Sequence, residues 1–148
     1  MPEPVTRIEV HPYPIATLRH RAGLVRNTRP PAPLALELRY SAVDPYAVRI
    51  KLAAEGAEVR WALSREMLLL GLRRHDGLGE VAVWPVRPLS GPALVRVRLG
   101  SAEAGAVVET ELDVIAEWLY VTQRLVPLGC EASYIRWDDF LLPLLDGS

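Results

Sequence analysis

The fold is decided by the stretch LALELRYSAVDPYAVRIKL, residues 34–52, in which two alternating segments flank Asp44 and Pro45. Leucines and Tyr40 alternate with small or charged residues before this pair, and Val48 and Ile50 do so after it. A period of two is typical of a half-buried β-strand, because successive side chains point to opposite faces of the sheet. Aspartate accepts backbone hydrogen bonds in turns, and proline presets φ. We therefore predict two antiparallel strands joined by a structural turn at Asp44 and Pro45.

The same alternation extends to both sides of this hairpin, and short turns rather than helices separate most of the strands. A Glu55-Gly56 turn leads into a third strand that contains Val59 and Trp61. Further strands are predicted at residues 16–26, 80–86, 93–99 and around 107–108. About seven strands in this order indicate an antiparallel α+β fold rather than an alternating α/β fold.

Three helices are expected among these strands. Ser64 is a good N-cap for a short helix that stops near Gly71, and residues 110–113 (TELD) have the form of a capping box before a long helix at 112–126. A second short helix is expected at 139–145. The apolar stripe of the long helix is wider than one sheet face requires, which predicts a subunit contact. The candidates for this contact are Val114, Trp118 and Val121.

Length and composition indicate one globular domain. The chain has 148 residues, of which 50% are hydrophobic and 24% charged. We divide it into a proline-rich N-terminal arm at residues 1–14 and a single domain at 15–148. The single cysteine, Cys130, allows no internal disulfide and is expected to be buried. No signal peptide or membrane-spanning run is apparent, so a cytoplasmic location is expected.

Charge is distributed unevenly along the chain. Residues 1–100 carry fifteen basic and nine acidic side chains, and residues 101–148 carry two basic and nine acidic ones. Either the two parts neutralise each other within or between protomers, or the basic part binds nucleic acid. The residues that could bind a partner are Arg49, Arg96 and Arg98 on the outer positions of two strands, and Arg73, Arg74 and Asp76 in a loop.

Nothing in the sequence assembles a catalytic or metal site. Residues 77–82 (GLGEVA) match the dinucleotide fingerprint formally, but a predicted strand follows where that motif needs a helix, so the segment is interpreted as a turn. His75 and Asp76 lack further ligands close in sequence, and Glu131 beside Cys130 disfavours a reactive thiolate. We therefore predict no enzyme, no cofactor and no metal.

These segments together resemble the SsgA-like family of actinobacterial sporulation and cell-division proteins. The resemblance rests on residues 38–40 (LRY), 44–48 (DPYAV), 61–72 (WALSREMLLLGL), 77–85 (GLGEVAVWP), 118–122 (WLYVT), 126–129 (VPLG) and 137–145 (WDDFLLPLL). It covers about residues 16–146 in order. The arm at 1–14 has no clear counterpart, and Leu128 stands where members often have a second proline.

The resemblance implies a non-enzymatic protein that helps to localise or organise the tubulin-like division GTPase FtsZ at the septum. The implied partners are FtsZ and other SsgA-like or septation proteins. The implied fold is similar to the whirly class, barrel-like and trimeric, with a dimer as the alternative assembly. Because whirly proteins bind single-stranded nucleic acid, such binding is the alternative function, although the net charge of −1 argues against it.

Overall fold

The computed structural model describes residues 3–10 and 13–135, and these form a single antiparallel sheet with two α-helices and one 3-10 helix. The sheet order is β5-β4-β3-β2-β9-β8-β7-β6, and β1 pairs with β2 beside this path. The nine strands in the described residues are β1 (Val5–Glu9), β2 (Ile15–Leu24), β3 (Ala32–Ser41), β4 (Asp44–Ala54), β5 (Ala57–Ser64), β6 (Asp76–Leu78), β7 (Val81–Val86), β8 (Leu94–Leu99) and β9 (Ala106–Glu111).

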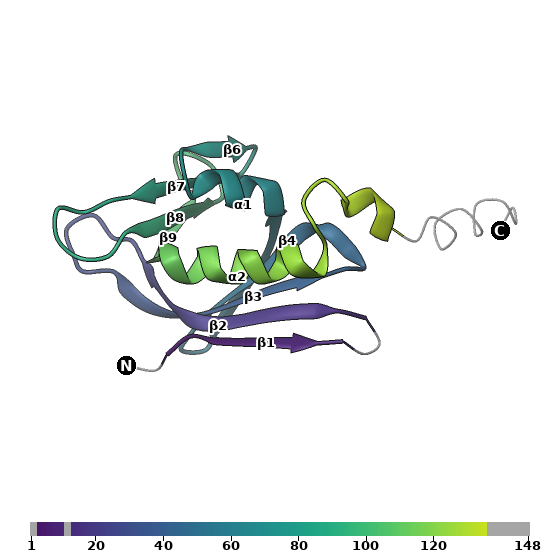
Figure 1. Cartoon of the computed structure of the whole chain (residues 1–148). Coiled ribbons are helices and arrows are strands. Elements are labelled where there is room, and N and C mark those ends of the chain that lie inside the picture. The colour runs from purple at the N-terminus through teal and green to yellow at the C-terminus, as the bar shows by residue number, and fades with distance from the viewer. Residues whose placement is uncertain (1–2, 11–12, 136–148) are drawn as a thin grey trace, which may run out of the picture.

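The sheet curls around one helix. Figure 1 shows α2 (Leu112–Leu125) between β2 and β3 on one side and β7 and β8 on the other. The predicted α+β class and the antiparallel strand pairing are confirmed. β3, and β4 from Ala47 onward, alternate as expected, because their apolar side chains face the enclosed helix and their charged side chains face outward. In β5 the alternation is limited to Trp61 and Leu63, since the first four residues are exposed.

The strand count differs from the prediction of about seven because β1 and β6 were missed. The prolines of the predicted arm lie outside residues 5–9, so five consecutive residues remain free to pair with β2. β6 lies in a segment interpreted as loop and turn. It pairs with β7 across a tight turn in which Gly79 has a φ of +62°, a value that favours glycine.

The two predicted helices that fall in the described residues are present. α1 (Arg65–Gly71) begins as expected, since the Met67 amide donates to the Ser64 hydroxyl oxygen at 3.1 Å. A Cβ added at Gly71 would overlap Val83, so the glycine lets α1 lie directly against β7. The capping box before α2 is not formed, because Thr110 belongs to β9 and donates to the Arg21 carbonyl instead. The helix expected at 139–145 lies outside the described residues.

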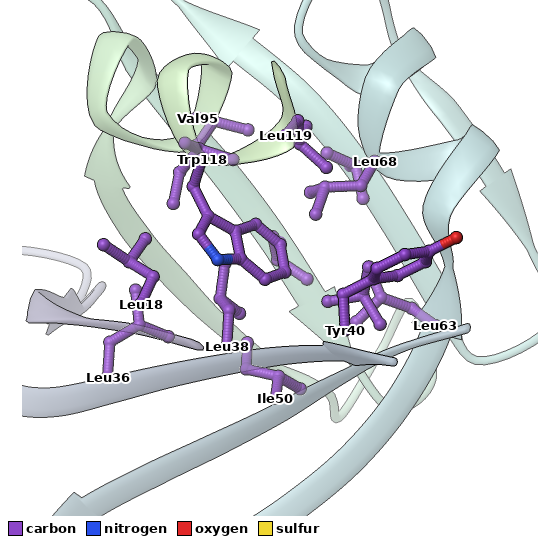
Figure 2. Close-up of a cluster of buried hydrophobic side chains, with 14 of the residues drawn as sticks. Leu18, Leu36, Leu38, Tyr40, Ile50, Leu63, Leu68, Val95, Trp118 and Leu119 are labelled. Carbon is purple, nitrogen blue, oxygen red and sulfur yellow. The ribbon is translucent and has the colours of Figure 1, made fainter. Parts of the chain in front are cut away.

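The core fills the space between the sheet and α2. Figure 2 shows Trp118 projecting from α2 toward Leu38. Leu18 lies on one side of its indole ring, and Tyr40 and Leu68 lie on the opposite side. Trp118 is 1% exposed. Among the other large apolar side chains that are almost fully buried are Leu18, Tyr40, Val48, Val83, Val95, Ile115 and Leu119.

The corner at Asp44 and Pro45 is a structural element, although the turn is displaced by two residues. Ala42 and Val43 form the turn, and Asp44 and Pro45 are the first residues of β4. The Tyr40 hydroxyl donates to the Pro45 carbonyl at 2.8 Å. This bond holds the start of β4 over the end of β3, where the register shifts between Arg39 and Ser41.

Candidate protein-interaction site

The pairing register places the predicted strand arginines on the outer face of the sheet. Arg49 lies opposite Arg39, and Arg96 lies opposite Trp84, while the intervening residues Val48 and Val97 are buried. Opposed residues of an antiparallel pair share a face. The basic residues are nevertheless in two groups, because β2 and β9 separate β3–β5 from β7–β8 in the sheet order.

Neighbouring carboxylates neutralise most of the group on β3–β5. Its basic residues line a shallow hollow on the outer face. Arg49 lies 3.3 Å from Asp44, Lys51 lies 3.6 Å from Glu37, and Arg60 lies 2.9 Å from Glu58. Exposed pairs of this kind contribute little to stability, but they leave little free charge for a partner. Within this group, only Arg39 has no carboxylate within 4.0 Å among the described residues.

The second group forms a more distinctive site. A hollow at the β6–β8 end of the sheet is lined by Arg74, His75, Trp84, Pro85 and Arg98, which we call the His75–Trp84 site. The His75 and Trp84 rings are stacked, with centroids 5.7 Å apart and an interplanar angle of 20°. Stacked rings are rigid and amphipathic, which is typical of the centre of a protein-binding surface.

The elements that precede and follow His75 in the chain fix the His75–Trp84 ring stack in place. The Arg74 amide donates to the Leu70 carbonyl at 3.1 Å, which continues the α1 turn past Gly71. β6 then begins at Asp76, opposite Val83 of β7. His75 therefore lies in the short link between α1 and β6, beside the strand that carries Trp84.

The site carries positive charge that the rest of the described chain does not neutralise. Arg98 Nε donates to the Gly100 carbonyl at 3.0 Å, which orients its guanidinium without removing its charge. Neither Arg74 nor Arg98 has a carboxylate within 4.0 Å in residues 3–10 and 13–135. A guanidinium in this state can form a bidentate pair with an incoming carboxylate.

The structure thus brings together only part of the predicted partner-binding set. Arg74 and Arg98 meet at the His75–Trp84 site, and Arg73 is exposed next to it in the chain. Arg96 lies 3.7 Å from Glu109, and Arg49 belongs to the distant first group. Sequence reasoning missed the pairing of His75 with Trp84, because the 76–78 segment was not predicted as a strand and nothing else linked the two residues.

The candidates for a subunit contact on α2 occupy different environments. Trp118 is buried within its own chain, so its assignment to a surface contact is corrected: the width of the stripe reflects a helix enclosed on two sides by the curled sheet. Val114 and Val121 are half-buried against the core. The exposed residues of α2 are Asp113, Glu117, Tyr120 and Arg124.

The prediction that Cys130 is buried is wrong, and Tyr46 departs from the alternation of its strand. Cys130 is exposed rather than buried, because it follows the Pro127–Gly129 turn on the surface. Tyr46 has the parity of Val48 and Ile50 but is 52% exposed, because the register shift between Arg39 and Ser41 reverses the faces at the start of β4, where Pro45 is buried instead.

A buried arginine, which the sequence analysis did not identify, anchors the end of α2. The Arg65 side chain is 1% exposed and donates to the carbonyls of Val126 at 2.8 Å and Thr122 at 3.2 Å. It also donates to the Glu131 carboxylate at 2.8 Å, and its guanidinium carbon lies 4.6 Å from the centre of the Tyr40 ring. We call these residues the Arg65 cluster. The guanidinium caps the carbonyls at the negative end of the helix dipole.

The cluster shifts the ionisation of both of its acidic partners. Burial raises the pKa of the Tyr40 hydroxyl, and this outweighs the opposite effect of the Arg65 charge. Partial burial raises the pKa of Glu131, but hydrogen bonds from its own amide, from Arg65 and from Gly129 outweigh it. The net pKa of Glu131 is therefore below its usual value of 4.5.

This shift predicts an acid-dependent loss of stability. Because the folded pKa of Glu131 lies below its unfolded value, its contribution is fully present above about pH 4.5 and is lost as pH falls through the folded pKa. We expect Glu131→Gln to lower the free energy of unfolding at pH 7, and we expect the difference from the parent to shrink steadily below pH 4.5. Urea unfolding of both proteins between pH 7 and 3 measures this difference. A difference that is constant with pH would contradict the assignment.

The described residues contain no helix long and apolar enough to cross a membrane. Within the same part of the chain, no three histidine, cysteine or acidic side chains converge on one point.

Comparison with known proteins identifies the family. The family model described as Streptomyces sporulation and cell division protein, SsgA, matches residues 34–131, from β3 to the start of η1 (Glu131–Tyr134). The chain belongs to the SsgA family. This part includes the His75–Trp84 site and the Arg65 cluster but not β1 or β2.

Several members of the SsgA family are similar to this chain over most of their length. The sporulation-specific cell division protein SsgB of Thermobifida fusca is 34% identical over 116 residues, which cover 78% of this chain and 83% of SsgB. SsgB of Streptomyces coelicolor is 34% identical over 123 residues, covering 82% and 89%. SsgB of Salinispora tropica is 36% identical over 118 residues, covering 78% and 82%.

Two solved SsgA-family structures share the fold. An SsgA-like sporulation-specific cell division protein from Thermobifida fusca superposes with a TM-score of 0.78 at 32% identity, covering 87% of this chain and 94% of the other. An SsgB structure from work on mutations that correlate to longitudinal cell division during sporulation of Streptomyces coelicolor gives a TM-score of 0.75 at 31% identity, covering 82% and 95%.

Proposed function

We propose that this SsgA-family protein is a cell-division and sporulation regulator that acts through protein contacts and without catalysis. In this proposal it localises or organises FtsZ at septum sites, and it works in the cytoplasm as an oligomer recruited to the septum. Family membership supports the division role, since the SsgB relatives are named sporulation-specific cell division proteins. The His75–Trp84 site supports the mode of action, because it is a hollow with stacked aromatic rings and arginines on a rigid sheet.

The observation that carries the proposal is the combination of stacked rings with two arginines that lack a carboxylate partner within the part of the chain that the structure describes. Aromatic and arginine side chains are the residue types that dominate binding energy in protein interfaces. Their positive charge favours a partner segment that presents carboxylates. Arg73 lies next to Arg74 and adds to the same field. We therefore propose this site, rather than the neutralised group on β3–β5, as the contact with the division machinery.

Co-sedimentation with FtsZ polymers tests this proposal. We expect the purified protein to pellet with polymer, and Arg74→Glu/Arg98→Glu to weaken binding at least about tenfold, because two attractive contacts become repulsive. Arg21→Glu is the matched control, because Arg21 is also exposed on the outer face of the sheet but lies on β2. We expect it to change binding by less than about twofold.

The outcomes separate the parts of the proposal. If the parent protein neither pellets with polymer nor alters its assembly, direct recruitment of FtsZ is wrong. If both charge variants behave alike, the contact lies elsewhere on the molecule. Light scattering on the same samples measures the number of subunits.

Single-stranded nucleic-acid binding is the second candidate, because the His75–Trp84 site combines an aromatic ring with cations. The stacked His75 covers one face of Trp84, which leaves less of the ring for a base, and the sequence pI is about 6.3. A fluorescence titration with a labelled oligonucleotide distinguishes the two functions. Micromolar binding that weakens steeply with salt would favour nucleic acid.

A further inference from the structure

The strand β1 has one open edge. It pairs with β2 from Val5 opposite Arg19 to Glu9 opposite Ile15. β9 joins the same border of β2 at Gly23 and Leu24, so it lies beyond the end of β1 rather than beside it. Figure 1 shows β1 along the outer border of the molecule, and no other strand of the described residues pairs with it. An open edge offers unpaired backbone donors and acceptors to another strand.

This edge strand also exposes apolar side chains. All five of its residues are exposed, including Val5 at 52% and Ile8 at 49%. Ile8 lies opposite Ala16, which is 0% exposed, so it belongs to the inner, apolar face of the sheet. Arg7 and Glu9 lie on the outer face, in line with Thr17 and Ile15. β1 therefore extends the apolar face beyond the part that the chain covers.

We propose that two copies of this chain pair through β1, antiparallel, with the two Ile8 residues facing each other at a two-fold axis. In this register Arg7 lies opposite Glu9 of the partner subunit, and Glu9 lies opposite Arg7 of the partner subunit. The pairing therefore places two attractive charge pairs on the outer face and an isoleucine contact on the inner face. Opposite charges and apolar side chains in cross-strand positions each stabilise a sheet.

The sequence of β1 favours this register over its neighbours. Residues that lie opposite each other in a sheet must be on the same face. When two copies of one strand pair antiparallel about a two-fold axis, a residue of one copy therefore lies at the axis, opposite the same residue of the other copy. If the axis were at Arg7, the Arg7 side chains of the two copies would lie opposite each other. If it were at Glu9, the two Glu9 side chains would lie opposite each other. An axis at Thr6 leaves Arg7 opposite Val5 and forms no charge pair. Of these, Ile8 is the position that opposes unlike charges.

This interface is distinct from the proposed contact with the division machinery. β1 lies outside residues 34–131, which the family model matches, and β9 separates β2, the strand with which β1 pairs, from β7 and β8, which carry the His75–Trp84 site. A five-residue strand pair buries less than a standard interface, so we expect a reversible association. The pairing is compatible with other subunit contacts, and the test reads the β1 contact itself rather than the total mass.

Disulfide crosslinking in the full-length chain provides this test. In a Cys130→Ser background, Ile8→Cys places two thiols opposite each other, whereas Thr6→Cys on the same face places them about 13 Å apart along the strand. We expect mild oxidation to crosslink the Ile8→Cys protein and to leave the Thr6→Cys protein largely monomeric on a non-reducing gel. Absence of the Ile8 crosslink, or equal crosslinking at both positions, would overturn the proposal.

Charge reversal in the Ile8→Cys protein supplies an independent readout. We expect Arg7→Glu and Glu9→Arg each to slow crosslinking about fivefold or more, because each opposes two like charges across the axis. The double variant Arg7→Glu/Glu9→Arg restores both unlike pairs, so it should recover the parent rate to within about twofold. A double variant that is slower than either single variant would rule out this register. Circular dichroism checks that each variant remains folded.

Discussion

Replacement of Arg65 by alanine is expected to lower the free energy of unfolding by about 3–5 kcal/mol. The Arg65 side chain is 1% exposed, and its removal takes the charged donor away from the Glu131 carboxylate and from the carbonyls of Thr122 and Val126. The loss of a buried partner is more costly than the loss of an exposed one, because the remaining polar groups stay desolvated. Urea unfolding at pH 7, followed by circular dichroism, measures the change.

Two controls distinguish the geometry of the guanidinium from its charge. Arg65→Lys keeps the charge but cannot contact the helix end and Glu131 as a planar fork, so we expect an intermediate loss. Arg124→Ala removes an exposed arginine from α2 and should change the free energy of unfolding by less than about 0.5 kcal/mol. A loss below about 1 kcal/mol for Arg65→Ala would show that the cluster does not anchor the end of α2.

The Arg65 cluster shows which features of this fold the sequence can specify. The strands from β2 to β5 were predictable because alternation is a local signal that the pleat imposes on every half-buried strand. The contact between Arg65 and Val126 joins residues 61 positions apart, and no local pattern encodes it. An arginine in the first turn of an amphipathic helix is usually solvated, so its burial depends on the tertiary arrangement.

At the His75–Trp84 site, too, the features that could not be predicted depend on contacts between residues far apart in the sequence. Arg98 was identified because its strand alternates, and Arg74 because its loop is basic, but their proximity depends on β6, which is only three residues long. The burial of Trp118 depends on the curl of the sheet around α2. The sequence therefore predicts which face of an element a residue occupies better than what covers that face.

Replacement of Trp118 by alanine is expected to destabilise the protein by about 3–5 kcal/mol. Trp118 is 1% exposed and fills the space between α2 and β3, which carries Leu38 and Tyr40, as Figure 2 shows. Truncation removes a large buried apolar area and leaves a cavity that the enclosing sheet cannot close. Thermal and urea unfolding measure the loss.

A second variant separates the packing of this ring from its polar atom. Trp118 Nε1 is buried without a hydrogen-bond partner among the described residues, so Trp118→Phe removes an unpaired donor as well as volume. We expect this variant to lose less than half of the stability that the alanine variant loses, because removal of the unpaired donor offsets part of the cost of the lost volume. Tyr120→Ala is the control on the same helix, since Tyr120 is 64% exposed and should change the free energy of unfolding by less than about 0.5 kcal/mol. If Trp118→Ala instead reduced subunit association and left the unfolding of each subunit unchanged, the ring would belong to an interface and not to the core.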